Sequence, residues 1–118
     1  MKIVRSIIGK VLTTLSTLTQ PKLGKRSPQK QLKIEQELKD YSLYQFNACP
    51  FCIKVRRAMR RLNLPIELKN VNIDQDLKKE LIAQGGSSKV PCLKIKDTWM
   101  YESDDIIKYL ENKFPLLS

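Results

Sequence analysis

The chain has 118 residues, of which 42% are hydrophobic and 29% charged, which suits one domain with an extension but not two full domains. Three cysteines and no histidine exclude a Ser-His-Asp triad within the chain and argue against a secreted disulfide scaffold. The net charge of +10 comes mainly from residues 1–30, which hold seven basic residues and no acidic one.

Residues 1–20 are expected to form an amphipathic helix, because apolar residues recur within 3–18 at the i, i+3, i+4, i+7 spacing of one helix face. A standard transmembrane helix is not expected, since the sequence has no run of 18 apolar residues. We expect residues 3–18 to make peripheral contact with a membrane, and docking on the domain or on a partner is the alternative. A cleaved signal is a third interpretation, but Lys10 interrupts the apolar run. The expected location is cytoplasmic, with this contact at the inner face of the membrane.

Residues 21–38 are interpreted as a basic linker. The stretch 21–30 contains two prolines, one glycine and four basic residues, a composition typical of flexible connections. A short polar helix over residues 31–39 is the one regular element expected here.

Residues 39–118 are expected to form the folded domain. Strands are predicted over residues 41–46, 66–73, 90–95 and 98–101, and helices over 50–62, 74–84 and 104–113, the last with Ser103 as its N-cap. A strand–helix–strand opening implies a parallel pair, and the two-residue connection at 96–97 implies an antiparallel hairpin. The order therefore predicts an α/β fold with a mixed four-stranded sheet flanked by helices on both faces.

The motif Cys49-Pro50-Phe51-Cys52 lies between the first strand and the helix that follows it. Free N–H groups and the dipole at a helix start stabilise a thiolate, so Cys49 is the expected attacking thiol and Cys52 the resolving thiol. The alternatives are two buried structural cysteines or half of a zinc site. No metal is expected, because the chain has no second cysteine pair to complete a zinc site.

Three motifs carry a resemblance to a known family: the Cys49–Cys52 motif, Val90-Pro91 before the third strand, and Glu102-Ser103-Asp104 before the last helix. On these residues, positions 41–114 resemble glutaredoxins of the thioredoxin-like superfamily, and they are also similar to the N-terminal domain of glutathione transferases. The resemblance implies a thioredoxin-like, glutaredoxin-type fold. It also implies a dithiol oxidoreductase that uses glutathione to reduce protein disulfides or glutathionylated cysteines.

The same resemblance implies a glutathione site. Its proline is expected to be cis and to face the active cysteine, which exposes the backbone of the preceding residue to an extended substrate. The acidic-serine motif is expected to hold the γ-glutamyl end, although a plain helix cap with acids in the first turn is the alternative. The implied glutathione-binding residues are Phe51, Val90, Pro91, Glu102, Ser103 and Asp104.

Phe46 departs from the family pattern, because many glutaredoxins carry a basic residue there to hold the glycine carboxylate of glutathione. Arg56, Lys89 or Lys54 are the candidates to replace it. The departure motivates one alternative function, a thioredoxin-like electron carrier independent of glutathione. A second alternative is an iron–sulfur-binding glutaredoxin module, which Pro50 disfavours.

Cys92 and the basic residues of the 50–62 helix are expected to have structural roles. Cys92, directly after Pro91, is expected to be an inward-facing strand residue, with a third redox-active thiol as the alternative. The basic residues of the 50–62 helix are expected to form a solvated face or a docking face for acidic partners. No nucleic-acid partner is expected, because no aromatic interleaving or nucleic-acid motif accompanies them.

Overall fold

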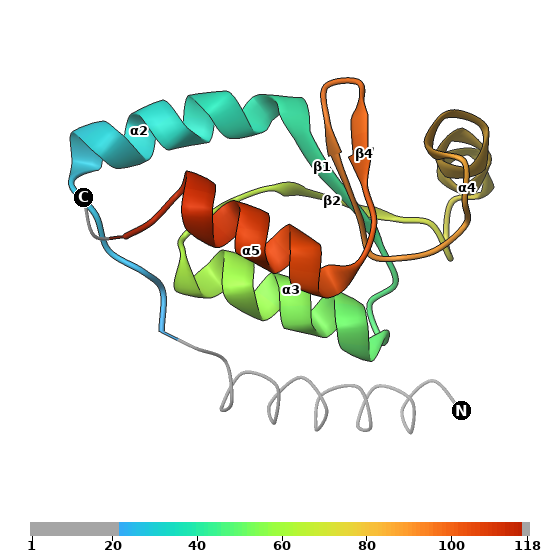
Figure 1. Cartoon of the computed structure of the whole chain (residues 1–118), viewed down its shortest axis with the longest axis horizontal. Helices are drawn as coiled ribbons and strands as arrows, with labels where there is room; N and C mark the ends of the chain where they lie inside the picture. The colour runs from blue at the N-terminus through green and yellow to red at the C-terminus, as the bar shows by residue number, and fades with distance from the viewer. Residues whose placement is uncertain (1–21, 117–118) are drawn as a thin grey trace, which may run out of the picture.

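A computed structural model describes residues 22–116 of the chain, so the helix expected within residues 1–20 lies outside the described part. Figure 1 shows one layer of sheet with helices packed around it. The helices are α2 (Pro28–Glu37), α3 (Pro50–Arg61), α4 (Gln75–Glu80) and α5 (Ser103–Lys113), and short helical turns cover Leu38–Asp40 and Leu81–Gly85. The strands are β1 (Tyr41–Gln45), β2 (Glu67–Asn70), β3 (Cys92–Ile95) and β4 (Thr98–Met100).

The four strands form one mixed sheet in the order β2-β1-β3-β4. Strand β1 pairs with β2 in parallel and with β3 antiparallel, and β3 pairs antiparallel with β4. Leu43 of β1 stands opposite Leu68 on one side and Leu93 on the other, which places β1 at the centre. The predicted parallel pair, hairpin and mixed sheet are therefore confirmed.

Both faces of the sheet are buried, because successive side chains point to opposite faces and a cluster of apolar residues packs on each. On one face, Leu43 and Leu93 belong to a core cluster with Val55 of α3 and Ile106 of α5. Figure 1 shows these two helices side by side. On the opposite face, a second cluster is built on Tyr44, Val71, Leu81 and Cys92, on the side of α4. Within residues 22–116, no helix is long and apolar enough to cross a membrane.

A polar contact fixes the end of α4 against the second face. The hydroxyl of Tyr44, which is fully buried, donates a hydrogen bond to Glu80 Oε1, and Lys94 Nζ lies 3.5 Å from the same carboxylate oxygen. The Tyr44 hydrogen bond, with the charges of Lys69 and Lys94, lowers the pKa of Glu80. Helix α4 and the turn after it are thereby held in place ahead of the loop that leads to β3.

The stretch 21–38, interpreted as a basic linker, is helical from Pro28 onward, which is earlier than expected. Helix α2 begins at Pro28, and the Ser27 hydroxyl caps it by accepting from Lys30 N–H at 3.3 Å. A serine followed by proline is a helix-start signal, but the proline and glycine content of this stretch favoured a flexible linker. The polar helix expected over 31–39 is confirmed as an element, but it starts three positions earlier.

Arg26 ties this N-terminal segment to the domain. Its guanidinium donates to the carbonyl of Asn63 after α3 (3.3 Å) and to the carbonyl of Phe114 after α5 (3.0 Å). It also donates to Gln31 Oε1 at 2.6 Å, and Gln31 in turn donates to Asn63 O at 2.9 Å. One cation therefore satisfies carbonyls at the C-terminal ends of two helices, where positive charge is favourable.

Several element limits differ from the prediction for local reasons. Strand β3 begins at Cys92 rather than at Val90, because Pro91 has no N–H to donate to the ladder. Helix α5 begins at Ser103, so the N-cap position is Glu102 and not Ser103 as predicted. Glu102 has a φ of 71°, in the left-handed region, and its carbonyl accepts the first bond of the helix from Ile106 N–H at 3.0 Å.

We expect Arg26→Leu to lower the free energy of unfolding by ~1–3 kcal/mol, since it removes several hydrogen bonds to carbonyls that have little water access. Urea denaturation of the full chain measures the change. Lys25→Leu is the matched control, because Lys25 is exposed and adjacent. Equal stabilities of the two variants would contradict the anchoring role of Arg26.

Candidate active site

Cys49 is the N-cap residue of α3, so the free amides of the first turn face its side chain. Burial alone would raise the pKa of this thiol. The backbone N–H groups of Cys52 and Phe51, the Cys52 side chain and the charge of Arg56 favour the thiolate, outweigh burial and leave the pKa below its ordinary value. A thiol in this position exists as thiolate at a lower pH than a free cysteine does.

Cys52 lies one turn into the same helix and is fully buried. Burial raises the pKa of its thiol to about 11, partly opposed by a hydrogen bond from Phe46 N–H to Cys52 Sγ at 3.5 Å. The two thiols therefore differ in acidity and access. Cys49 is partly exposed and has a lowered pKa, whereas Cys52 is buried and stays protonated at neutral pH. This placement fits the attacking and resolving roles expected for them.

Arg56 holds the loop that carries Cys49. Its guanidinium donates to the side-chain oxygen of Gln45, to the carbonyl of Phe46 (3.3 Å) and to the carbonyl of Asn47 (2.7 Å). Gln45, itself fully buried, donates to Asn47 Oδ1 at 2.9 Å and Asn70 Oδ1 at 2.7 Å. The end of β1, the loop at 46–48 and the end of β2 are thus joined to α3 by one polar network.

That network was missed from the sequence, although a glutamine at the end of a buried strand was a usable signal. Arg56 had been a candidate to bind a glutathione carboxylate in place of a basic residue at position 46. The structure instead shows its guanidinium engaged with the loop. Its charge still acts on both thiols of the motif, whose pKa values it lowers.

A groove of about 260 Å³ lies at the start of α5 and is bounded by the first turn of α3. The Val90-Pro91 peptide is cis, as the resemblance implied, and Val90 lies just before the β3 ladder begins at Cys92. Five of the six residues predicted to bind glutathione meet here, together with two that were not on that list. The lining residues are Phe51, Lys89, Val90, Pro91, Tyr101, Glu102 and Ser103.

Asp104 is the predicted binding residue that does not line the groove. Its carboxylate is exposed and forms an ion pair with Lys54 of α3, which also lowers the pKa of Asp104. Of the three basic residues considered as replacements for Phe46, Lys54 and Arg56 are therefore engaged elsewhere. Lys89 is the one that lines the groove.

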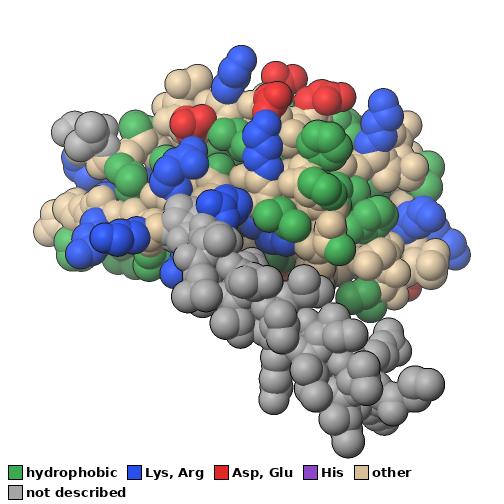
Figure 2. Space-filling model, turned by 90° about the horizontal axis from the view of Figure 1, so that it is seen from below, with side chains coloured by type: hydrophobic (Ala, Val, Ile, Leu, Met, Phe, Trp, Pro, Cys, Tyr) green, Lys and Arg blue, Asp and Glu red, His purple; other side chains and the backbone are tan. Residues whose placement is uncertain are grey.

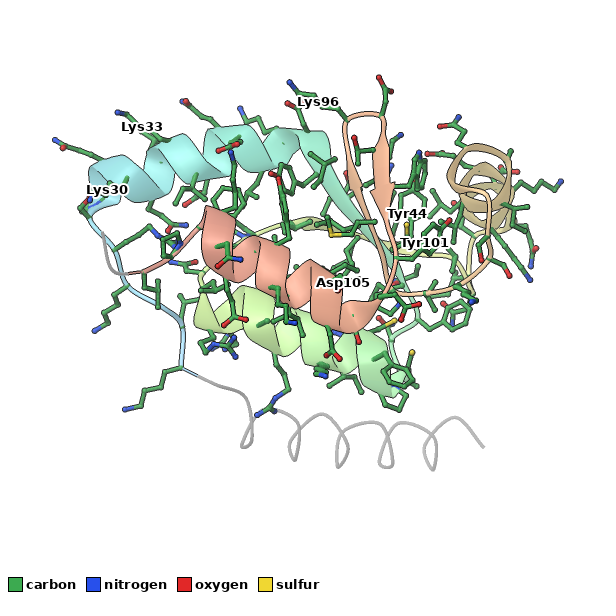
Figure 3. The ribbon with its side chains drawn as sticks, viewed as in Figure 1. Lys30, Lys33, Tyr44, Lys96, Tyr101 and Asp105 are labelled. Carbon is green, nitrogen blue, oxygen red and sulfur yellow. The ribbon has the colours of Figure 1, made fainter. Side chains whose placement is uncertain are left out.

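Tyr101 positions the loop that carries three of the groove residues, and no sequence motif singles it out. Its hydroxyl accepts from Ser87 N–H at 3.3 Å and donates to Ser87 O at 3.0 Å. A side chain at Gly85 would come within 2.4 Å of the same hydroxyl, so the loop packs closely on it. Figure 3 shows Tyr101 near Tyr44, at the end of the sheet that faces α4.

Cys92 is an inward-facing strand residue, as expected. Burial raises the pKa of its thiol to about 11, and the Tyr101 hydroxyl only partly offsets this rise. A shielded, protonated thiol is a poor nucleophile. Among residues 22–116, no group of three or more histidine, cysteine or acidic side chains is placed to hold a metal ion.

The geometry agrees with comparisons to known proteins. Residues 43–117 match the family model of the glutathione S-transferase N-terminal domain. The chain belongs to this family. It is 37% identical over 68 residues to the glutathione S-transferase DHAR3, chloroplastic, of Arabidopsis thaliana, covering 57% of this chain and 26% of that protein. It is 34% identical over 71 residues to glutaredoxin 2 of Escherichia coli K12, covering 58% of this chain and 32% of that protein.

Solved structures bear out the thioredoxin-like fold. Glutathione transferase E6 from Drosophila melanogaster superposes with a TM-score of 0.54 at 25% identity, over 63% of this chain and 34% of that one. A wheat glutaredoxin superposes with a TM-score of 0.51 at 18% identity, over 76% of this chain and 88% of that one, which supports the fold alone. The resemblance to glutaredoxins and to transferase N-terminal domains is thus confirmed, while the chain spans about a third or less of its curated relatives.

We expect Tyr101→Phe to loosen the loop before Pro91, because the change removes both hydrogen bonds to Ser87. Amide hydrogen exchange of Ser87 should become about fivefold faster or more, the ratio that corresponds to a hydrogen bond of ~1 kcal/mol. Tyr109→Phe is the control, since it also removes a hydroxyl that hydrogen-bonds another tyrosine, Tyr41, at 3.1 Å on the opposite face. Unchanged exchange at Ser87 in Tyr101→Phe would show that the hydroxyl does not hold the loop.

Proposed function

We propose that this chain is a glutathione-dependent thiol–disulfide oxidoreductase of the dithiol glutaredoxin type, which reduces protein disulfides or glutathionylated cysteines. The observation that carries the proposal is the contrast between two thiols three positions apart. The helix-start amides lower the pKa of Cys49, whereas burial raises the pKa of Cys52 to about 11. The likeness to glutaredoxin 2 supports the same chemistry.

The proposed reaction begins when the Cys49 thiolate attacks one sulfur of a client disulfide. A bond forms between Cys49 and that sulfur, and the other client sulfur leaves as a thiolate that takes up a proton. Cys52 then loses its proton and attacks Cys49 Sγ, which releases the second client thiol and leaves a Cys49–Cys52 disulfide. Two glutathione molecules reduce this disulfide and leave as glutathione disulfide, so two electrons pass from glutathione to the client.

On a glutathionylated client, one thiol suffices. The Cys49 thiolate attacks the glutathione sulfur, and the client cysteine leaves reduced. A second glutathione then attacks the glutathione sulfur of this mixed disulfide, which releases glutathione disulfide and restores the Cys49 thiolate. Cys52 is dispensable in this branch, which separates the two kinds of substrate experimentally.

The groove between α3 and α5 offers groups that suit glutathione. The backbone of Val90 lies before the ladder of β3 and can pair with the extended tripeptide. The first amides of α5 and the Ser103 hydroxyl suit the γ-glutamyl carboxylate, and Glu102 suits its ammonium. Lys89 suits the glycine carboxylate, the task that Phe46 cannot perform. Asp104, paired with Lys54, is left at the edge of this arrangement.

A second candidate function is transfer of glutathione to an electrophile. The transferase family match and the likeness to DHAR3 favour it. In that reaction the glutathione thiolate is the nucleophile and Cys52 has no task. Conjugation of glutathione to an aromatic halide that persists in Cys52→Ser, without any disulfide reduction by the wild type, would decide for transfer.

The client proteins, the cytoplasmic location and the membrane contact of residues 3–18 stay predictions.

We expect the three single cysteine variants to separate in a glutathione-coupled mixed-disulfide assay. Cys49→Ser should fall to background, because it removes the attacking thiolate. Cys52→Ser should keep activity on a glutathionylated peptide but lose it on a peptide with an internal disulfide. Cys92→Ser is the control and should retain both activities, since that thiol is buried away from the exchange. Full activity of Cys49→Ser would contradict the proposed function.

A further inference from the structure

A second hollow lies between α3 and the edge strand β2, with a volume of about 320 Å³. We call it the α3–β2 groove and define it by Leu23, Ile53, Arg57, Arg60, Ile66 and Leu68, which are among its lining residues. Strand β2 is at one end of the sheet order, so its outer edge pairs with no other strand of the described part. An open sheet edge beside a hollow is a place where an extended chain can bind.

The groove gathers large apolar side chains that are left in contact with solvent. Leu23 is 50% exposed, Leu68 43% and Ile53 36%, although each comes from a different segment of the chain. They converge because Gly24 N–H donates to Arg60 O at 3.3 Å, which fastens the segment with Leu23 to the end of α3. Exposed apolar residues that cluster in a concavity, rather than scatter singly, indicate a binding surface.

The charges along α3 divide between its two flanks. On the flank toward α5, Lys54 pairs with Asp104, and Arg61 Nη2 lies 3.4 Å from Glu111 Oε2. Figure 2 shows acidic side chains gathered along one edge of this view, with basic and apolar side chains across the rest of the visible face. On the flank toward β2, Arg57 and Arg60 line the groove, and no acidic residue of the described part lines it. An acidic partner would place negative charge beside Arg57.

One end of the groove lies close to the reactive thiol along α3. Ile53 at one end follows Cys49 by one helical turn, and its N–H donates to Cys49 O at 2.9 Å. Helix α3 has 12 residues, about 18 Å at the usual rise, so five or six extended residues would match its length. A segment bound along the groove would thus bring a neighbouring part of the same molecule to Cys49.

We infer that the α3–β2 groove docks an extended segment of a client protein in which acidic and apolar residues alternate. Alternation suits an extended chain, because successive side chains point to opposite sides and can place apolar groups in the floor and carboxylates at Arg57. A peptide is favoured over a lipid surface because the exposed apolar residues line a hollow rather than a protruding face. This docking role rests on the proposed function, since it names the clients on which the thiols would act.

The test measures binding of a short fluorescent peptide without cysteine, in which leucine alternates with glutamate, to the reduced full-length protein by anisotropy at low salt. We expect binding that weakens as salt is added. Arg57→Glu should weaken it at least about fivefold, the effect of ~1 kcal/mol for a lost charge contact. Leu68→Ser should also weaken it, by removing apolar contact. Lys33→Glu makes the same charge change on α2, on the far side of the domain in Figure 3, and should leave the affinity unchanged.

Several outcomes would overturn the inference. These are equal binding by wild type and Arg57→Glu, equal binding of a peptide with lysine in place of glutamate, or an equal loss of affinity in Lys33→Glu. Sedimentation of the full chain with anionic vesicles that Arg57→Glu abolishes, with no peptide binding, would assign the surface to lipid instead. Because the peptide has no thiol, its failure to bind leaves the proposed reductase function standing. Failure of the disulfide assay would likewise leave the binding result unaffected.

Discussion

The effect of the first backbone amides of α3 on the sulfur of Cys49 is the interaction on which the site depends. It arises because Cys49 is the N-cap residue of the helix, with Pro50 in the first helical position, where no N–H is needed. Burial at this position works against a charged sulfur, and the amides with Arg56 reverse that tendency. Without this local geometry burial would raise the pKa of Cys49, as it does that of Cys52.

The rest of the fold keeps that helix start in place. Strand β1 delivers the chain to Cys49, and the buried Gln45 at its end joins Arg56, Asn47 and Asn70 in a polar network around the loop. Across the sheet, Tyr101 anchors the loop that brings the cis peptide to the groove. At the other end of α3, Arg26 binds the carbonyl that follows the helix. Both ends of the helix are therefore held by side chains from other segments.

The sequence allowed the fold and the central motif to be predicted, because both rest on local signals. Strand alternation, the two-residue hairpin and a proline after the first cysteine are readable over short stretches, and the structure has each of them. Contacts between residues that lie far apart in the sequence could not be predicted. Nothing local shows that Arg56 turns back to the loop, that Asp104 pairs with Lys54, or that Tyr101 reaches Ser87. The earlier start of α2 was not readable for the same reason, since Arg26 binds carbonyls that follow two other helices.

The most direct test of the central claim is a titration of thiolate absorbance in the ultraviolet, on the reduced wild type and on Cys49→Ser. One thiol of the wild type should titrate clearly below the ordinary cysteine value of about 8.5, and this step should vanish in Cys49→Ser. The thiol of Cys92 should titrate near pH 11 in both proteins, and that of Cys52 near pH 11 in the wild type but lower in Cys49→Ser, because the Cys49 thiolate raises its pKa. A wild type without the low step, or a low step that persists in Cys49→Ser, would contradict an activated thiolate at the start of α3.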